Sequence, residues 1–253
     1  MKVKEVRRIV RALLKAPIDR REPYAKFVSA QDTLEFAAML LGIKRVFLLG
    51  RGFDDQSWVS AVKRAAAKLG VAAMVEDAYW DSDYSKLNLP AWYRELRRSR
   101  QRATYISATG SVVSEIREMS ARGWVSPAEE AHLLGYPLCC VEDHHRRAVV
   151  IQDTFFRAVM RVARGDEQKA RSLLFEDVKF HLNDEEEAQM KSARELRPCP
   201  FASFYMCASC ASSDRSTARK LSRQYAKLAS DLDSALFATL EEAASFEESM
   251  TSR

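Results

Sequence analysis

The stretch RVFLLG (45–50), with QSWVSAVKRAAAKLG (56–70) and VAAMVED (71–77) after it, decides the fold class that the sequence predicts. Two short, unbroken apolar runs flank a segment whose apolar residues recur at helical spacing. Buried parallel strands joined by a crossover helix show this pattern. A third strand is expected at ATYISA (103–108), then a turn at TGS and a helix over 112–123. The N-terminal half is therefore predicted to be α/β, a small parallel sheet with flanking helices.

The C-terminal half is predicted to be helical. Ser126, Pro127 and Glu129 form a capping-box signature, and Gly135 ends that helix. Further helices are expected over 137–165, 167–182 and 184–196, and a single long one from about residue 213 to the C-terminal region. We therefore expect an α/β domain at 1–124 and a helical, cysteine-containing domain at 125–253.

Composition limits the class of protein. With 253 residues, 47% of them hydrophobic, the chain can bury a substantial core. Its N-terminus lacks the apolar centre of a signal peptide, and no run approaches the roughly 20 apolar residues of a membrane helix. Five cysteines, an odd number, fit a disulfide framework poorly. We expect a cytoplasmic protein without a membrane partner.

All five cysteines fall into two compact groups. Cys139 and Cys140 lie in LGYPLCCVEDHHRR (134–147), and Cys199, Cys207 and Cys210 lie in CPFASFYMCASC (199–210). The last two have the Cys-x-x-Cys spacing that lets two sulfurs bind one metal. An all-sulfur set suits an iron–sulfur cluster or zinc, and the adjacent pair favours a [4Fe–4S] cluster, with zinc as the alternative. Burial in the core, or reactive thiols without a metal, would also account for cysteines in these positions.

GYPLCC, residues 135–140, resembles the Gly-Tyr-Pro-x-Cys-Cys signature of an uncharacterised prokaryotic domain-of-unknown-function family, in which a cysteine-rich segment follows. The resemblance covers about residues 126–215 and implies no established reaction. In ligand type alone, the chain is also similar to cluster-binding queuosine-pathway reductases, which combine a Cys-Cys pair with Cys-x-x-Cys motifs.

The helix that carries the cysteine pair also supplies candidate catalytic residues. His144 is four residues after Cys140, and Asp143 is four after Cys139, so each pair shares a helix face. Neighbouring helical side chains diverge by about 100°, so we expect Cys139 to be the firm ligand and Cys140 to face a cavity or the core. The predicted function is an iron–sulfur enzyme that acts on a small polar substrate by Lewis-acid, redox or sulfur chemistry, with an electron donor as partner in the redox case.

Substrate contacts are expected where strands of a parallel sheet end, because ligands bind beyond their carboxyl ends. The candidates there are Arg51, Asp77, Thr109 and Ser111. The competing hypothesis is a zinc-stabilised, non-catalytic module that binds nucleic acid such as tRNA, or a protein. Five arginines beside two aromatic residues in WYRELRRSRQR (92–102) support it.

Overall fold

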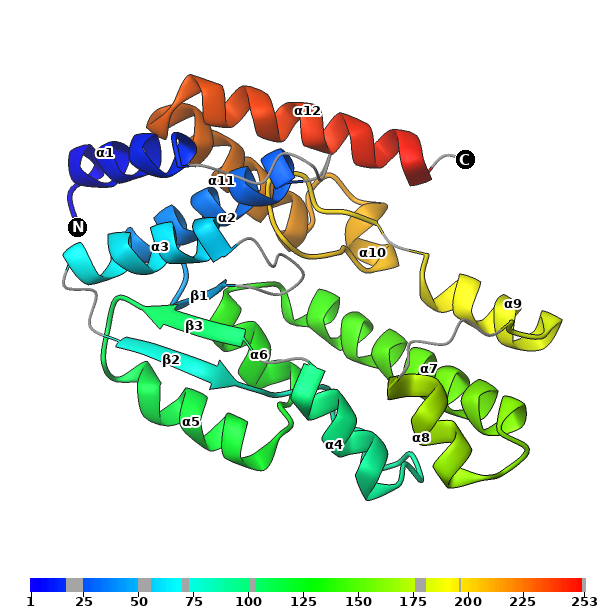
Figure 1. The fold of residues 1–253 in the computed structure, drawn as a ribbon. Helices are drawn as coiled ribbons and strands as arrows, with labels where there is room; N and C mark the ends of the chain where they lie inside the picture. Colours follow the sequence, from blue (N-terminus) through cyan, green and yellow to red (C-terminus); the bar gives the residue numbers. More distant parts are fainter. Residues whose placement is uncertain are drawn as a thin grey trace.

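The computed structural model describes residues 1–16, 25–49, 56–69, 73–100, 103–175, 181–195 and 197–251. Its first half contains the helices α1 (Val3–Leu14), α2 (Ala25–Leu40), α3 (Gln56–Lys68), α4 (Ala91–Arg100) and α5 (Val112–Arg122), and the strands β1 (Val46–Leu49), β2 (Ala73–Ala78) and β3 (Ala103–Ser107) (Figure 1). Its second half contains α6 (Pro127–Leu134), α7 (Leu138–Val162), α8 (Glu167–Phe175), α9 (Asp184–Ala193), α10 (Ala208–Ala211), α11 (Thr217–Leu232) and α12 (Ser234–Thr251). The described chain is therefore mostly helical, with one small sheet. Among the described helices, none combines the length and apolar character needed to cross a bilayer.

The sheet is antiparallel, so the prediction of a parallel sheet was wrong. Its strand order is β1-β3-β2, and β3 runs antiparallel to both neighbours, with Ser107 opposite Val46 on one side and Ala73 on the other. The strands β1 and β2 run in the same direction, as the strand–helix–strand pattern indicates, but β3 lies between them. A continuous apolar run indicates that a strand is buried on both faces of its sheet. Antiparallel strands that are covered on both faces show the same pattern, so the run does not reveal the direction of the neighbouring strand.

Helices cover both faces of the sheet, which explains those apolar runs (Figure 1). Alternate strand residues point to opposite faces. Phe47, Leu49 and Ile106 belong to a core shared with α1, α2 and α3. On the other face, Val46 and Tyr105 belong to a second core with residues of α5 and α6.

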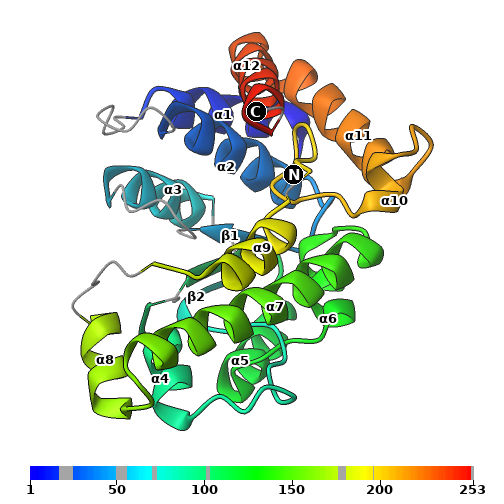
Figure 2. The ribbon, with the colours of Figure 1, turned by 90° about the vertical axis from the view of Figure 1, so that its right-hand side faces the viewer.

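The N-terminal and C-terminal helices pack against each other. The first core joins residues of α1 and α2, such as Val6 and Leu34, to residues of α11 and α12, such as Tyr225 and Leu236. Figures 1 and 2 show α12 lying beside α2 and α11, against which it packs. One apolar core thus contains residues from both sides of residue 124, while the division into domains 1–124 and 125–253 stays a prediction.

Local capping signals set several helix ends. At the start of α6, Ser126 Oγ accepts a hydrogen bond from the Glu129 backbone N–H, and Glu129 accepts one from the Ser126 N–H at 2.8 Å, which confirms the capping box. The prediction of one long C-terminal helix was wrong, because Asp233 is extended between α11 and α12. Its Oδ1 accepts from the Ala235 N–H at 2.9 Å and so caps a new helix.

Candidate metal centre

Four of the five cysteines converge on one point. Cys139 and Cys140 lie in the first turn of α7, while Cys207 is the N-cap of α10 and Cys210 lies within it. The four sulfur atoms all lie within 4.8 Å of one another. The Sγ atoms of Cys139 and Cys210 are 3.5 Å apart, and those of Cys140 and Cys207 are 3.8 Å apart. This group is able to hold a metal ion or a metal cluster.

A tight hairpin over residues 197–206 carries α10 to the start of α7. Its arms are joined by hydrogen bonds from the Cys199 N–H to the Phe204 carbonyl at 3.0 Å and from the Met206 N–H to the Arg197 carbonyl at 2.6 Å. The next backbone N–H, that of Cys207, points at the Cys140 sulfur at 3.5 Å. A backbone donor aimed at sulfur stabilises a thiolate, which is the form that binds metal.

The fifth cysteine is not part of this group. Cys199 is buried in the hairpin, and its thiol donates to the Ala218 carbonyl oxygen at 3.6 Å. Cys139 and Cys140, by contrast, both place their sulfurs in the group, although we expected them to diverge. Rotation about Cα–Cβ lets two short thiol side chains on adjacent helical residues reach a common point.

Three of the thiols in the group differ in acidity. Burial by itself would raise the pKa of Cys207, but hydrogen bonds from Ser209 and from the Cys210 backbone and thiol lower it to about 7. Desolvation of its sulfur beside the other thiols raises the pKa of Cys139 to about 11, although the residue as a whole is exposed. Burial also raises the pKa of Cys140. Of these three thiols, that of Cys207 has the lowest pKa, and the choice of Cys139 as the firm ligand stays a prediction.

The candidate catalytic residues Asp143 and His144 lie in different surroundings. The Asp143 carboxylate forms ion pairs with Arg146 and Arg147 of the same helix, and its oxygen lies 3.1 Å from Arg147 Nε. His144 is exposed and, together with Cys140, lines a cavity beside the cysteine group. Their catalytic roles stay predictions.

This cavity has a volume of about 260 Å³ and is built from several segments. Besides His144 and Cys140, it is lined by Asp32, Glu35, Lys44, Phe47, Leu48, Glu130, Leu134, Tyr136, Val141, Ser203, Phe204 and Tyr205. Most of its polar residues were missed by reasoning from the sequence. One signal was available: Glu35 is the only charged residue in TLEFAAMLLGI (33–43), and a lone charge in an apolar helix requires a buried partner.

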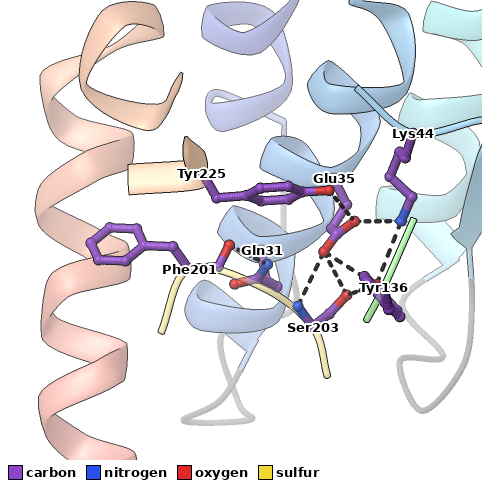
Figure 3. A network of polar contacts seen from close by, with 7 residues as sticks. All are labelled: Gln31, Glu35, Lys44, Tyr136, Phe201, Ser203 and Tyr225. Atoms are coloured by element: carbon purple, nitrogen blue, oxygen red, sulfur yellow. Dashed lines mark hydrogen bonds and ion pairs between the residues drawn. The ribbon is translucent and has the colours of Figure 1, made fainter. Parts of the chain in front are cut away.

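That partner is Lys44, in the connection between α2 and β1. The two side chains form a buried ion pair, with 3% of Glu35 and 2% of Lys44 exposed. Glu35 also accepts hydrogen bonds from the Ser203 N–H at 3.1 Å, from Ser203 Oγ at 2.8 Å and from the hydroxyls of Tyr136 and Tyr225 at 3.3 Å each (Figure 3). Burial by itself would raise the pKa of Glu35, but the Lys44 charge and these hydrogen bonds lower it.

A second carboxylate on α2 has a different environment. Asp32 accepts a hydrogen bond from Trp58 Nε1 at 3.1 Å. Burial of its carboxyl group raises the pKa of Asp32 to about 7, despite this hydrogen bond. A third carboxylate of the cavity, Glu130, pairs with His145 Nε2 at 2.6 Å, and both side chains are 8% exposed.

The predicted substrate residues do not gather at one edge of the sheet. Arg51 lies outside the described residues. Asp77 is exposed near the end of β2, which pairs with the beginning of β3, whereas Thr109 and Ser111 are exposed just beyond the end of β3. Because β3 is antiparallel to β2, these two positions lie at opposite ends of the sheet. The rule that motivated the set applies to parallel sheets.

The arginine-rich segment is anchored through its aromatic residues. Trp92 and Tyr93 are buried in a third core with residues of α7 and α8. Arg97 is ion-paired with Asp81, and both side chains are largely buried. Stacking of nucleobases needs accessible rings, and these two rings are covered.

Comparisons with models of protein families, with curated proteins and with solved structures give no match. The resemblance of GYPLCC to a family signature therefore stays a prediction, and the function is argued from the site itself.

Proposed function

We propose that the four-cysteine group binds one Zn²⁺ in a closed tetrathiolate site. The observation that carries this proposal is the spacing of the sulfurs. Four sulfurs placed about 2.3 Å from one zinc at the corners of a tetrahedron stand about 3.8 Å from one another. The sulfurs of Cys139 and Cys210 are 3.5 Å apart, those of Cys140 and Cys207 are 3.8 Å apart, and all four lie within 4.8 Å of one another. Small side-chain rotations would complete the tetrahedron.

The zinc would have a structural role, because four protein ligands leave no open coordination position. It would fasten the start of α7 to the hairpin over 197–206 and to α10. The start of α7 and the hairpin also contribute walls of the cavity: Tyr136 comes shortly before the cysteine pair, and Ser203, Phe204 and Tyr205 come shortly before Cys207. Binding of metal would therefore fix the shape of the cavity.

We propose that this cavity is the site of a small-molecule ligand. It combines apolar walls with a few convergent polar groups and a carboxylate of strongly shifted pKa, which is the usual make-up of a ligand site. His144 is the candidate proton-transfer residue at its wall. Cys140 would be occupied as a metal ligand, so its predicted catalytic role is replaced by a positional one.

A [4Fe–4S] enzyme is the second candidate, because the same all-thiolate set also suits a cluster. In a cubane each thiolate binds a different iron, so the sulfurs must lie outside a four-iron core. They would have to move apart from their present spacing, and the exposed position of Cys139 leaves room on that side. An electron donor would be the partner of such an enzyme if its chemistry were redox.

A cytoplasmic location is part of the proposal. The five cysteines are free thiols, although two pairs of sulfurs lie within 3.5 and 3.8 Å. Thiols so close together stay reduced, or stay metal-bound, in the cytoplasm.

The test is metal analysis of protein purified anaerobically, with zinc, iron and acid-labile sulfide measured per chain. We expect one zinc per chain and colourless protein, whereas brown protein with matching iron and sulfide would favour the cluster. Cys207→Ser should lose the metal. Cys199→Ser is the matched control, because it removes a buried cysteine outside the group and should retain full metal. Full zinc retention in a Cys207→Ser, Cys210→Ser double variant would rule the site out.

A further inference from the structure

The carboxylates of the cavity differ in how their charge is compensated. Glu35 has Lys44 as its ion-pair partner, and Glu130 has His145. Among the described residues, the Asp32 carboxylate accepts a single hydrogen bond, from Trp58, and forms no ion pair. When Asp32 is ionised, the cavity therefore carries a carboxylate that no cation of the described residues contacts.

The rest of the wall is largely apolar and aromatic. Phe47, Leu48, Leu134, Val141 and Phe204 contribute to it. The ring of Tyr136 packs on Phe204 with 4.7 Å between centroids. Aromatic faces attract cations, and apolar side chains bury the body of an organic ligand. If each non-hydrogen atom takes about the volume of one water molecule in the liquid, the cavity has room for on the order of ten such atoms.

From these observations we infer that the cavity binds a small organic cation, an ammonium or amidinium group on an apolar or aromatic body, with Asp32 as its counter-ion. This inference rests on the proposed function in that the cavity is the ligand site, and it adds the class of ligand.

Other ligand classes fit less well. An anion would meet three carboxylates, while the Lys44 ammonium is engaged by Glu35. A bare metal ion would need several ligand atoms around one point, and within the described part of the chain the cysteines alone form such a group. Above pH 7, where Asp32 is mostly ionised, a neutral ligand would leave its charge unbalanced.

Binding of a cation is coupled to the ionisation of Asp32. A cation favours the carboxylate over the carboxylic acid, and burial raises the pKa of Asp32 to about 7, so affinity should rise as the pH rises through 7 with release of a proton. The other titratable groups that face the cavity are Glu35, Lys44, Glu130, Tyr136, Cys140, His144 and Tyr205, of which Cys140 would be held by the proposed zinc.

The experiment is calorimetric titration of the zinc-loaded, full-length protein at pH 8 with three ligands of one shape: 2-phenylethylamine, 2-phenylethanol and phenylacetate. We expect the amine to bind roughly tenfold or more tightly than the other two, since a hydrogen bond between charged groups is the stronger kind. Asp32→Asn keeps the size of the side chain and should abolish this preference. The matched control Asp214→Asn removes the same charge from an exposed position and should leave it unchanged. Leu48→Phe narrows the cavity and should weaken binding of the amine.

The outcomes separate the two proposals. If the alcohol or the acid binds as tightly as the amine, or if Asp32→Asn retains the preference for the amine, the inference is overturned and the cavity remains a ligand site. If none of the three ligands binds, the inference and the proposed ligand site both fail. The zinc content of each variant, measured alongside, tests the metal site independently.

Discussion

Replacement of Glu35 by glutamine tests the buried network that supports the cavity. Glu35→Gln keeps the shape of the side chain, and its amide oxygen can still accept a hydrogen bond from Ser203. The change removes the negative charge and leaves the Lys44 ammonium, of which 2% is exposed, without a counter-ion. Removing one partner of a buried ion pair costs about 3–5 kcal/mol. We therefore expect a loss of that size in the free energy of unfolding.

The assay is urea denaturation of zinc-saturated protein at pH 7, supported by thermal unfolding. For a chain of this size, each kcal/mol corresponds to a shift of about 2–4 °C in Tm, so the variant should melt about 6–20 °C lower. Glu242→Gln is the matched surface control, because Glu242 pairs with Lys26 at 2.7 Å but the two side chains are 59% and 60% exposed. It should cost less than about 1 kcal/mol. Adding Lys44→Met to Glu35→Gln removes the unpaired charge and should restore much of the stability.

The loss of stability in Glu35→Gln should also depend on pH, in a direction that the pKa of Glu35 determines. The pKa of Glu35 in the folded protein is lowered from its ordinary value of 4.5. Its contribution to stability is therefore present above pH 4.5 and is lost as the pH falls through the folded-state pKa. The difference between wild type and Glu35→Gln should shrink in acid. A loss for Glu35→Gln no larger than that for Glu242→Gln, or a difference that is constant down to acid pH, would refute the argument.

Three further changes have defined outcomes. Removal of the metal by a chelator should lower the denaturation midpoint, measured by circular dichroism, of the wild type and of Cys199→Ser. It should not change the midpoint of Cys207→Ser, because that variant has already lost its metal. Equal effects on all three proteins would contradict a shared site. Asp32→Asn should stabilise the protein at pH 8 but not at pH 4. The pKa of the Asp32 carboxyl is raised from 3.8 to about 7 in the folded protein, so its contribution to stability is present below pH 3.8 and is lost as the pH rises through 7. Urea denaturation midpoints at both pH values check this. Gly135→Ala should cost about 1–2 kcal/mol by denaturation, because Gly135 has φ +71° and an added Cβ would lie 3.3 Å from the Lys44 Cβ; an unchanged midpoint would show that this turn adapts.

Features that depend on residues close together in the chain could be predicted from the sequence. The capping box of Ser126 and Glu129 is formed by residues three positions apart, so their side-chain types suffice to locate the helix start. The concentration of the cysteines in two groups indicated a shared site, and four of the five sulfurs do lie together. The helix break at Asp233 is also local, but leucines at four-residue spacing on both sides of it, Leu228, Leu232, Leu236 and Leu240, favoured one continuous helix.

The tertiary structure alone decided the features that join distant residues. Insertion of β3 between β1 and β2 depends on how the chain crosses the sheet, and an apolar run carries no information about the direction of its neighbour. The choice of four cysteines, with Cys199 left out, depends on the path of the hairpin over 197–206. Glu35 receives hydrogen bonds from residues 101, 168 and 190 positions away. Contacts at such separations leave no periodic pattern in the sequence, because packing of the whole chain, and no local propensity, brings the partners together.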